Sequence, residues 1–420
     1  MNLTWLFEAT LTLFFVGFLF QDLYLWLPPV NRLLGAFLAL LAISSWLQRR
    51  GRIPAEVALF CAFIAWGVLT GFLFARQQSL VLAYGRQLIQ ELVLLFALAE
   101  YATVRRAPTF AFLLLLVASL GLWWYAYGTG QLAPAQAGGV HQRAVSFTSN
   151  PNYLGILCLY GSFGTAYFLW NRTKSKLVLW PLITLPFIGA TLLASGSRKS
   201  ILSVGVFALT WAAIAYGRTK ASRTKPVLVL LMVAAILFLA GRYVMESTST
   251  GERFRQAART PHVDVTRHDL YQEGWTMFLR APFHGVGLGN FVEYSSVKGY
   301  AHSDYMEVLA TTGAVGFLLY YSIYLVLWLR LRRVLKKRSD VASRYAVGLY
   351  QAIVITSLLV GLGRPNFLDP LHLYIVGVMV GHACAMEQDL RSTRPAESGA
   401  RKDVTSPLPV AAHRASRSSL

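Results

Sequence analysis

The chain contains little charge and few cysteines for its length. Of its 420 residues, 14% are charged, 55% are hydrophobic and three are cysteines. The mean hydropathy of +0.48 is too high for a soluble globular protein of this size and indicates an integral membrane protein. The cysteines Cys61, Cys158 and Cys384 lie in apolar stretches. Free cysteine behaves there as a small hydrophobe, and three supply no disulfide framework.

Several motifs of soluble enzymes are absent from the sequence. It has no G-x-x-x-x-G-K-[ST] motif for ATP, no D-x-D pair or His/Cys cluster for a metal, and no G-x-S-x-G elbow for acyl transfer. We therefore expect neither a cofactor nor a bound metal.

Acidic residues are scarce, at 19 against 39 lysines and arginines, which gives a formal net charge of +20. We do not expect a nucleic acid partner, because the positive charges fall in short clusters between apolar runs. The clusters occupy every second connection, at 49–52, 105–106, 172–176, 218–225 and 330–338. Cytoplasmic loops of membrane proteins carry such an excess, so the pattern predicts that these clusters and both termini are cytoplasmic.

Apolar segments near the roughly 20 residues needed to cross a bilayer recur along the chain. They lie at about 3–20, 30–47, 54–74, 80–100, 109–127, 151–170, 177–194, 201–217, 226–244, 303–329, 345–363 and 369–386. The sequence thus predicts an all-α polytopic membrane protein with about twelve transmembrane helices. The first segment lacks a basic leader and a small-residue cleavage site, and we interpret it as a retained helix.

The other connections fall on the exterior side, which is periplasmic in a cell with two membranes. The longest, at about 245–301, joins predicted helices 9 and 10, and its apolar spacing from Val265 to Leu279 favours a short helix at the membrane surface. We divide the chain into a transmembrane domain, 1–386, and a Ser-, Arg- and Pro-rich tail, 387–420, which we expect to be disordered and cytoplasmic.

Two exterior positions hold residues suited to group transfer. Arg198 follows a Ser-Gly-Ser turn and precedes Lys199, and a guanidinium can bind a phosphate through two parallel hydrogen bonds. His302 stands at the start of a long helix, and an imidazole with a pKa near about 6.5 can exchange a proton at neutral pH. The alternatives are an arginine that reaches lipid phosphates and a histidine that marks the membrane interface.

Other polar residues carry weaker signals. Arg267 lies in the long exterior loop, where such residues usually form solvated ion pairs. Arg86 lies in the fourth span together with Glu91, where charges are costly; it is placed to reach an anionic headgroup, and a structural pair with Glu91 is the alternative. Arg364 has no motif around it, and we interpret it as an interfacial arginine.

Two local patterns describe turns. Asn150 and Pro151 are typical of a helix cap and first helical residue. The glycines at 285, 287 and 289 permit a tight turn and an approach to phosphate, but no strand precedes them, so they are not a dinucleotide fingerprint.

The spacing of two motifs resembles a known family. Arg198 to Leu202 fits an R-x-x-x-L element, and His302-Ser303 is followed after nine residues by the G-A-V-G of 313–316, which fits H-[NSQ]-x(9)-G-x-x-G. Together they resemble the bacterial O-antigen ligase and polymerase superfamily, in which these motifs lie on the periplasmic side of a polytopic protein. The stretch from Arg267 through the 285–289 glycines is also similar to that family's approach to the histidine.

The resemblance implies a metal-independent glycosyltransferase of the bacterial inner membrane whose donor is a glycan on undecaprenyl diphosphate. Arg198 and Arg267 would bind the diphosphate, and His302 would act at the acceptor hydroxyl, giving a single displacement with inversion. We add Lys199 and Arg86 as candidate substrate-binding residues. Asp304 is a further one on the acceptor side; it follows His302-Ser303, where many relatives have asparagine directly after the histidine.

Four functions remain open at this point. The leading hypothesis is a ligase that moves an O-antigen glycan to lipid A–core oligosaccharide within lipopolysaccharide biosynthesis. A polymerase that joins repeat units to a growing glycan would use the same motifs, and transfer to protein hydroxyls is a third variant. A transporter of small anions would also explain exterior arginines, although transporters often have inverted repeats and broken helices near the midplane, whereas the polar residues here collect on one face.

Overall fold

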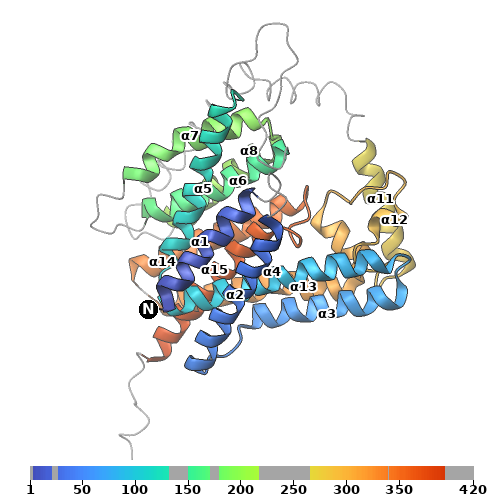
Figure 1. Cartoon of the computed structure of the whole chain (residues 1–420), viewed down its shortest axis with the longest axis horizontal. Coiled ribbons are helices and arrows are strands. Elements are labelled where there is room, and N and C mark those ends of the chain that lie inside the picture. The colour runs from blue at the N-terminus through green and yellow to red at the C-terminus, as the bar shows by residue number, and fades with distance from the viewer. Residues whose placement is uncertain are drawn as a thin grey trace, which may run out of the picture.

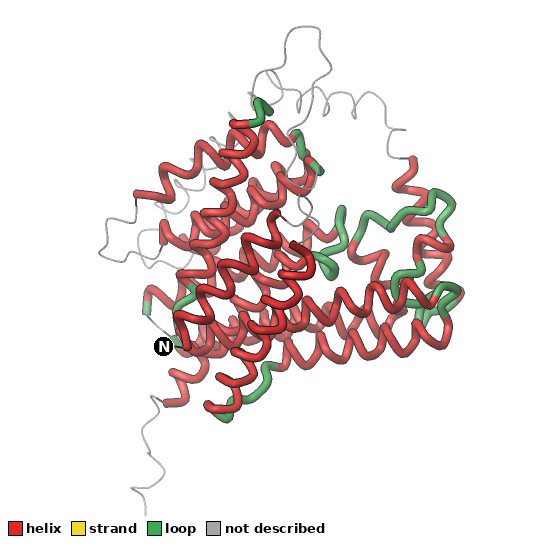
Figure 2. Tube along the Cα trace, in the orientation of Figure 1, coloured by secondary structure: helices red, strands yellow, loops and turns green. Residues whose placement is uncertain are grey.

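The computed structural model describes residues 3–20, 27–131, 150–170, 179–216, 265–338 and 340–392. Within these residues the chain is helical and contains no strand (Figure 2). The helices are α1 (Leu3–Phe20), α2 (Leu27–Arg49), α3 (Ala55–Phe74), α4 (Gln78–Arg105), α5 (Thr109–Gly128), α6 (Pro151–Trp170), α7 (Leu179–Ser195), α8 (Arg198–Tyr216), α11 (Val265–Arg280), α12 (Phe291–Tyr294), α13 (Asp304–Lys337), α14 (Val341–Gly361) and α15 (Pro370–Ser392).

Every predicted span that falls within the described residues corresponds to one of these helices, and the predicted surface helix corresponds to α11. Among the described helices, α2, α3, α4, α5, α13 and α14 are long and apolar enough to cross a membrane. The described part of the chain is therefore all-helical, and its apolar helices are those of a multi-pass membrane protein. The count of twelve spans and the side of each terminus remain predictions.

Some expectations lie outside the described residues. They are the span at 226–244, most of the loop at 128–149, the first part of the long exterior loop and the tail from 393. The last helix continues to Ser392, beyond the boundary at 386 expected from hydropathy.

The long helix α13 has neighbours from several parts of the chain. It packs against α3, α11, α14 and α15. Figure 1 shows α3, α4 and α13 running together, with α11 and α12 at one end. Helices α5, α6 and α7 pack on one another, and α8 packs on α6 and α14. This arrangement brings the starts of α6, α8 and α13 toward one region.

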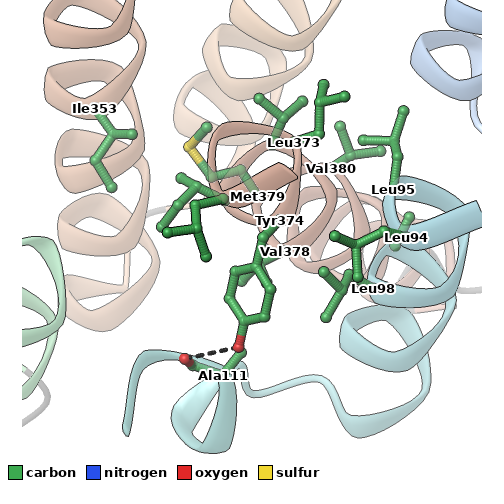
Figure 3. Close-up of a cluster of buried hydrophobic side chains, with 14 of the residues drawn as sticks. Leu94, Leu95, Leu98, Ala111, Ile353, Leu373, Tyr374, Val378, Met379 and Val380 are labelled. Atoms are coloured by element: carbon green, nitrogen blue, oxygen red, sulfur yellow. Dashed lines mark hydrogen bonds between the residues drawn. The ribbon is translucent and has the colours of Figure 1, made fainter. Parts of the chain in front are cut away.

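The tightest part of the core lies between α4 and α15. Leucines 94, 95 and 98 of α4 face Leu373, Tyr374 and Val378 of α15, and the Tyr374 hydroxyl donates to the Ala111 carbonyl at 2.9 Å (Figure 3). A Cβ at Gly377 would lie 2.8 Å from the Leu95 carbonyl oxygen, and one at Gly381 would lie 2.1 Å from that of Ala99. Small residues four apart let membrane helices approach closely and gain van der Waals contact, which explains this pair of glycines.

The apolar run from 303 to 329 had predicted one continuous helix, but α13 is interrupted. Gly313 has φ 67° and ψ −172°, which interrupts the helical hydrogen bonds. The freed Thr312 carbonyl accepts from the Trp66 indole at 2.9 Å, and the Ala314 N–H donates to the Pro282 carbonyl at 2.8 Å. Gly313, the first glycine of the G-x-x-G element, therefore interrupts the helix, and other parts of the chain satisfy the backbone groups beside it.

The glycines of the 285–289 turn pack against this break. Gly285 has φ 71°, and a Cβ there would lie 2.4 Å from the Thr311 carbonyl carbon. The Val286 and Gly287 N–H groups donate to the carbonyls of Ala310 and Thr311 at 2.9 and 3.0 Å. The expectation that these glycines could approach phosphate is wrong, because their close contacts are with α13 and neighbouring protein atoms.

Candidate active site

A cavity of about 560 Å³ lies where the starts of α6, α8 and α11, the segment before α13 and the loop between α14 and α15 meet. Among the residues predicted from sequence, it is lined by Arg198, Lys199, Arg267 and His302. These residues span more than a hundred positions of the chain. The fold thus brings together both halves of the sequence motif and the loop arginine between them.

The start of α8 holds Arg198 and Lys199 at the cavity wall. Gly196 has φ 59°, which turns the chain, and the Ser197 hydroxyl accepts from the Ser200 N–H at 3.4 Å. Helix α6 fits tightly here, since a Cβ at Gly155 would lie 2.5 Å from the Ser200 hydroxyl oxygen. The serines cap and pack the helix start, so the rigid turn fixes where both cations enter the cavity.

Lys199 is largely enclosed at the cavity wall, before the apolar part of α8. Its Nζ donates to the Gly363 carbonyl in the loop between α14 and α15. Burial, together with the charges of Arg364 and Arg267, lowers the pKa of Lys199 to about 7. The cations of the cavity therefore lie close enough to act on one another, and an anionic ligand would relieve their repulsion.

His302 lies in the loop before α13, because the helix begins only at Asp304. Ser303 is the N-cap and accepts from the Met306 N–H at 3.5 Å, while the buried Glu307 carboxylate accepts from the Ala301 N–H at 2.7 Å. These two bonds fix the backbone on both sides of His302, whose φ is 54°. Such a left-handed residue is uncommon outside glycine and is often found at functional sites.

The imidazole of His302 is half-buried against Tyr300, with ring centroids 4.1 Å apart. Burial and the positive charges of Arg267 and Lys199 lower the pKa of His302 below its usual 6.5. The neutral imidazole is therefore the main form at neutral pH and has a nitrogen free of a proton. That is the form that a general base requires.

Residues 183–321 match the family model described as O-antigen ligase. This segment contains Arg198, Lys199, Arg267 and His302, together with the broken start of α13. The segment 183–321 is therefore similar to the O-antigen ligase family. A protein of this family would be a glycosyltransferase-like enzyme of ligase or polymerase type. No curated protein matches the chain.

Asp304 of this O-antigen ligase-like protein does not line the cavity, although the sequence had suggested it as a substrate-binding residue. It is 1% exposed, and its Oδ1 accepts from the Asn366 and Phe367 N–H groups at 2.6 and 3.0 Å. The Tyr321 hydroxyl donates to its Oδ2 at 2.8 Å. Asp304 therefore holds the loop after α14 against the start of α13, and its role on the acceptor side stays a prediction.

Arg86 is exposed on α4 and is not among the residues that line the cavity. The structural pair with Glu91 that the sequence left open is not formed. Glu91 is 2% exposed, and its Oε1 accepts from the Gln87 amide at 3.1 Å. The structure thus places Arg86 neither beside Glu91 nor in the cavity, and its role in substrate binding stays a prediction.

Several residues of the cavity carried no functional signal in the sequence. They include Asn150, Asn152, Tyr153, Tyr300 and Arg364. The predicted helix cap is confirmed, since Asn150 Oδ1 accepts from the Asn152 N–H at 2.9 Å, but the same turn also forms cavity wall. Within the described part of the O-antigen ligase-like chain, no three His, Cys, Asp or Glu side chains are grouped as metal ligands would be.

Proposed function

We propose that the protein transfers an O-antigen glycan from undecaprenyl diphosphate to lipid A–core oligosaccharide at the periplasmic face of the bacterial inner membrane. One observation carries this proposal. Arg198, Lys199, Arg267 and Arg364 line a single cavity with His302, and no carboxylate is among the described residues that line it. A concave site rich in fixed cations, with one base, suits an anionic substrate that must lose a proton.

The cations suit the leaving group. When the bond between the anomeric carbon and the diphosphate oxygen breaks, negative charge develops on the diphosphate. Arginine binds phosphate oxygens through paired N–H groups and keeps its charge. Arg198 and Arg267, held on separate helices, would stabilise this charge in a partly dry site, where fixed donors act most strongly. Lys199 would add a further donor.

His302 suits the acceptor side of the reaction. The acceptor hydroxyl oxygen forms the new bond to the anomeric carbon, and its proton passes to the neutral imidazole. The lowered pKa of His302 keeps the imidazole ready to accept it at neutral pH. A two-step route would need a carboxylate nucleophile, and its absence from the described lining residues supports a single displacement with inversion.

The acceptor distinguishes a ligase from a polymerase, which would use the same donor chemistry on a growing glycan. The test is to delete the gene in its native host and to separate the lipopolysaccharide on a gel. Loss of ligation leaves long glycans on the lipid carrier, as we expect. Core carrying a single repeat would instead identify the protein as a polymerase.

In this proposal, cationic side chains and not a metal ion stabilise the charge on the leaving diphosphate. Transfer by the purified protein should therefore persist in EDTA. A loss of activity that Mg²⁺ or Mn²⁺ restores would contradict this part of the account.

A further inference from the structure

The loop between α14 and α15, residues 362–369, joins the elements that form the cavity. Its carbonyls accept hydrogen bonds from three other helices. Lys199 of α8 donates to Gly363, the Tyr271 hydroxyl of α11 donates to Leu362 at 2.9 Å, and the Gln87 amide of α4 donates to Leu368 at 2.9 Å. The 362–369 loop is thus fixed by the same elements that carry the predicted donor-binding residues.

Asp304 fixes the loop from the side of α13. Its carboxylate accepts both consecutive N–H groups at 366 and 367, and the Asn366 amide donates to the Ser357 carbonyl at 2.8 Å. Asp304 lies two residues after His302 in sequence. The position of the loop is therefore coupled directly to the segment that carries the candidate base.

Arg364 extends from this loop into the cavity wall. Its side chain is 21% exposed, and its Nη2 lies 3.4 Å from Asp369 Oδ2. The guanidinium carbon lies 5.1 Å from the centre of the Tyr153 ring. Asp369 is itself fixed, because its carboxylate accepts from the Tyr160 hydroxyl at 2.9 Å and from the Leu371 N–H at 3.2 Å. The guanidinium is therefore held in place before any ligand arrives.

The other terminal nitrogen of Arg364 lacks a hydrogen-bond partner. Nη1 is buried and unsatisfied, although the arginine lines the cavity. A buried charged donor without an acceptor is unfavourable. Because Nη1 has almost no accessible surface in the unliganded protein, a phosphate oxygen would reach it from the cavity after a small shift of the cavity wall and would supply the missing acceptor.

We propose that Arg364 is a third arginine of the donor site and that its Nη1 binds the diphosphate together with Arg198 and Arg267. The proposal rests on the proposed function. It names a residue outside the segment 183–321 that matches the family. The donor is favoured over a phosphate on the acceptor glycan, because Arg364 lines the same cavity as Arg198 and Arg267 and belongs to the loop that Lys199 contacts at Gly363.

The test compares Arg364→Gln and Arg364→Lys with the wild type. The Michaelis constants for the lipid-linked donor and for the acceptor are measured separately, together with inhibition by inorganic diphosphate. We expect Arg364→Gln to raise the donor constant and the inhibition constant for diphosphate about tenfold or more, with a smaller rise in Arg364→Lys and an unchanged acceptor constant. The control is Arg52→Gln, an exposed arginine outside the cavity, which should match the wild type.

Three results would overturn the assignment. One is an unchanged donor constant in a stably folded Arg364→Gln variant. Another is a raised acceptor constant alone, which would move the phosphate to the acceptor glycan. The third applies if Arg364→Gln does not fold, in which case Arg364→Lys is the deciding variant. A Michaelis constant for the donor raised about threefold or more supports the proposal, and a wild-type value overturns it.

The failure of the proposed function would look different. If the wild type transfers no glycan from any lipid diphosphate, that function fails. Binding of inorganic diphosphate, measured as a rise in melting temperature, still tests Arg364 in that case. The rise should shrink in Arg364→Gln and Arg364→Lys, and an equal rise in all variants would overturn the assignment.

Discussion

Arginine side chains have different neighbours at the two ends of α13. Toward its end, Arg330 is 12% exposed and lies 2.8 Å from a Glu56 carboxylate oxygen and 2.6 Å from one of Glu387. Before its start lies the cavity, whose described lining residues include four cationic side chains and no carboxylate. At one end the arginine is paired with two carboxylates, whereas at the other end four cations line one cavity and one of them, Arg364, is also paired with Asp369.

This difference separates structural from functional charge. The paired end has further bridges, which are Arg49–Glu100, Arg105–Glu8, Arg106–Asp389 and Arg338–Asp389. Removing one partner of a buried pair leaves an uncompensated charge and destabilises the fold. Grouped cations in a concave site instead repel one another until an anion binds, which is typical of functional sites.

The largest effect that we expect comes from the base. His302→Gln should reduce transfer about 10²–10⁴-fold, because an amide cannot take the acceptor's proton. The protein should remain in the membrane at a normal level, and the rate is measured with purified protein and lipid-linked donor. His268→Gln is the matched control, since His268 is exposed and contacts Gln272 of its own helix at 2.9 Å. Wild-type activity in His302→Gln would remove this residue from the site.

The next prediction compares the two kinds of arginine directly. Arg198→Ala should lower transfer about 100-fold with little change in melting temperature, because the residue serves the ligand. Arg330→Met should instead lower the stability by about 3–5 kcal/mol, because it leaves the buried Glu56 without its ion-pair partner and leaves Glu387 paired with Arg333 alone, while the folded fraction keeps its activity. Thermal unfolding in detergent and the rate of transfer are measured on both variants. The reverse pattern would contradict the division into structural and functional charge.

A smaller effect is expected at the break in α13. Gly313→Ala places a Cβ 2.3 Å from the Phe283 carbonyl carbon at a φ of 67°, and backbone strain alone costs about 1–3 kcal/mol. We expect lower folded yield and slower transfer, since the break sets the path of the segment before it. Gly205→Ala is the control, because a Cβ there meets nothing within 4 Å. Equal yields for both variants would show that the break is not needed.

The smallest effect concerns pH. Protonated His302 cannot act as a base, so kcat/KM should fall as pH decreases through the folded pKa, which lies below 6.5. Lys199→Gln removes one of the positive charges that lower this pKa, so the acid limb of the profile should move to higher pH. A limb that stays in place, measured from donor-limited rates between about pH 4.5 and 8, would show that Lys199 and His302 do not interact.

The sequence was most informative where function depends on local spacing. Hydropathy placed the helices, because a membrane span must be long and apolar wherever it packs. Arg198 and His302 were found because each belongs to a short motif and breaks the expected distribution of polar residues. The structure adds that both line one cavity.

The sequence was least informative where a role depends on contacts between distant segments. Arg364 resembled an ordinary interfacial arginine, because its partner Asp369 and its place in the cavity depend on the folding of α6, α8 and α15. Asp304 resembled a substrate ligand, because its bonds to residues 366 and 367 cross more than sixty positions. The break at Gly313 was invisible to hydropathy, since glycine also occurs in continuous membrane helices.

The central claim is that the cations of the cavity bind a lipid diphosphate. Its most direct test is the affinity of the purified protein for undecaprenyl diphosphate, measured for the wild type, Arg198→Ala and Arg330→Met. We expect Arg198→Ala to bind about tenfold or more weakly and Arg330→Met, scaled to its folded fraction, to bind as the wild type does. Equal affinity in the wild type and Arg198→Ala would contradict the account.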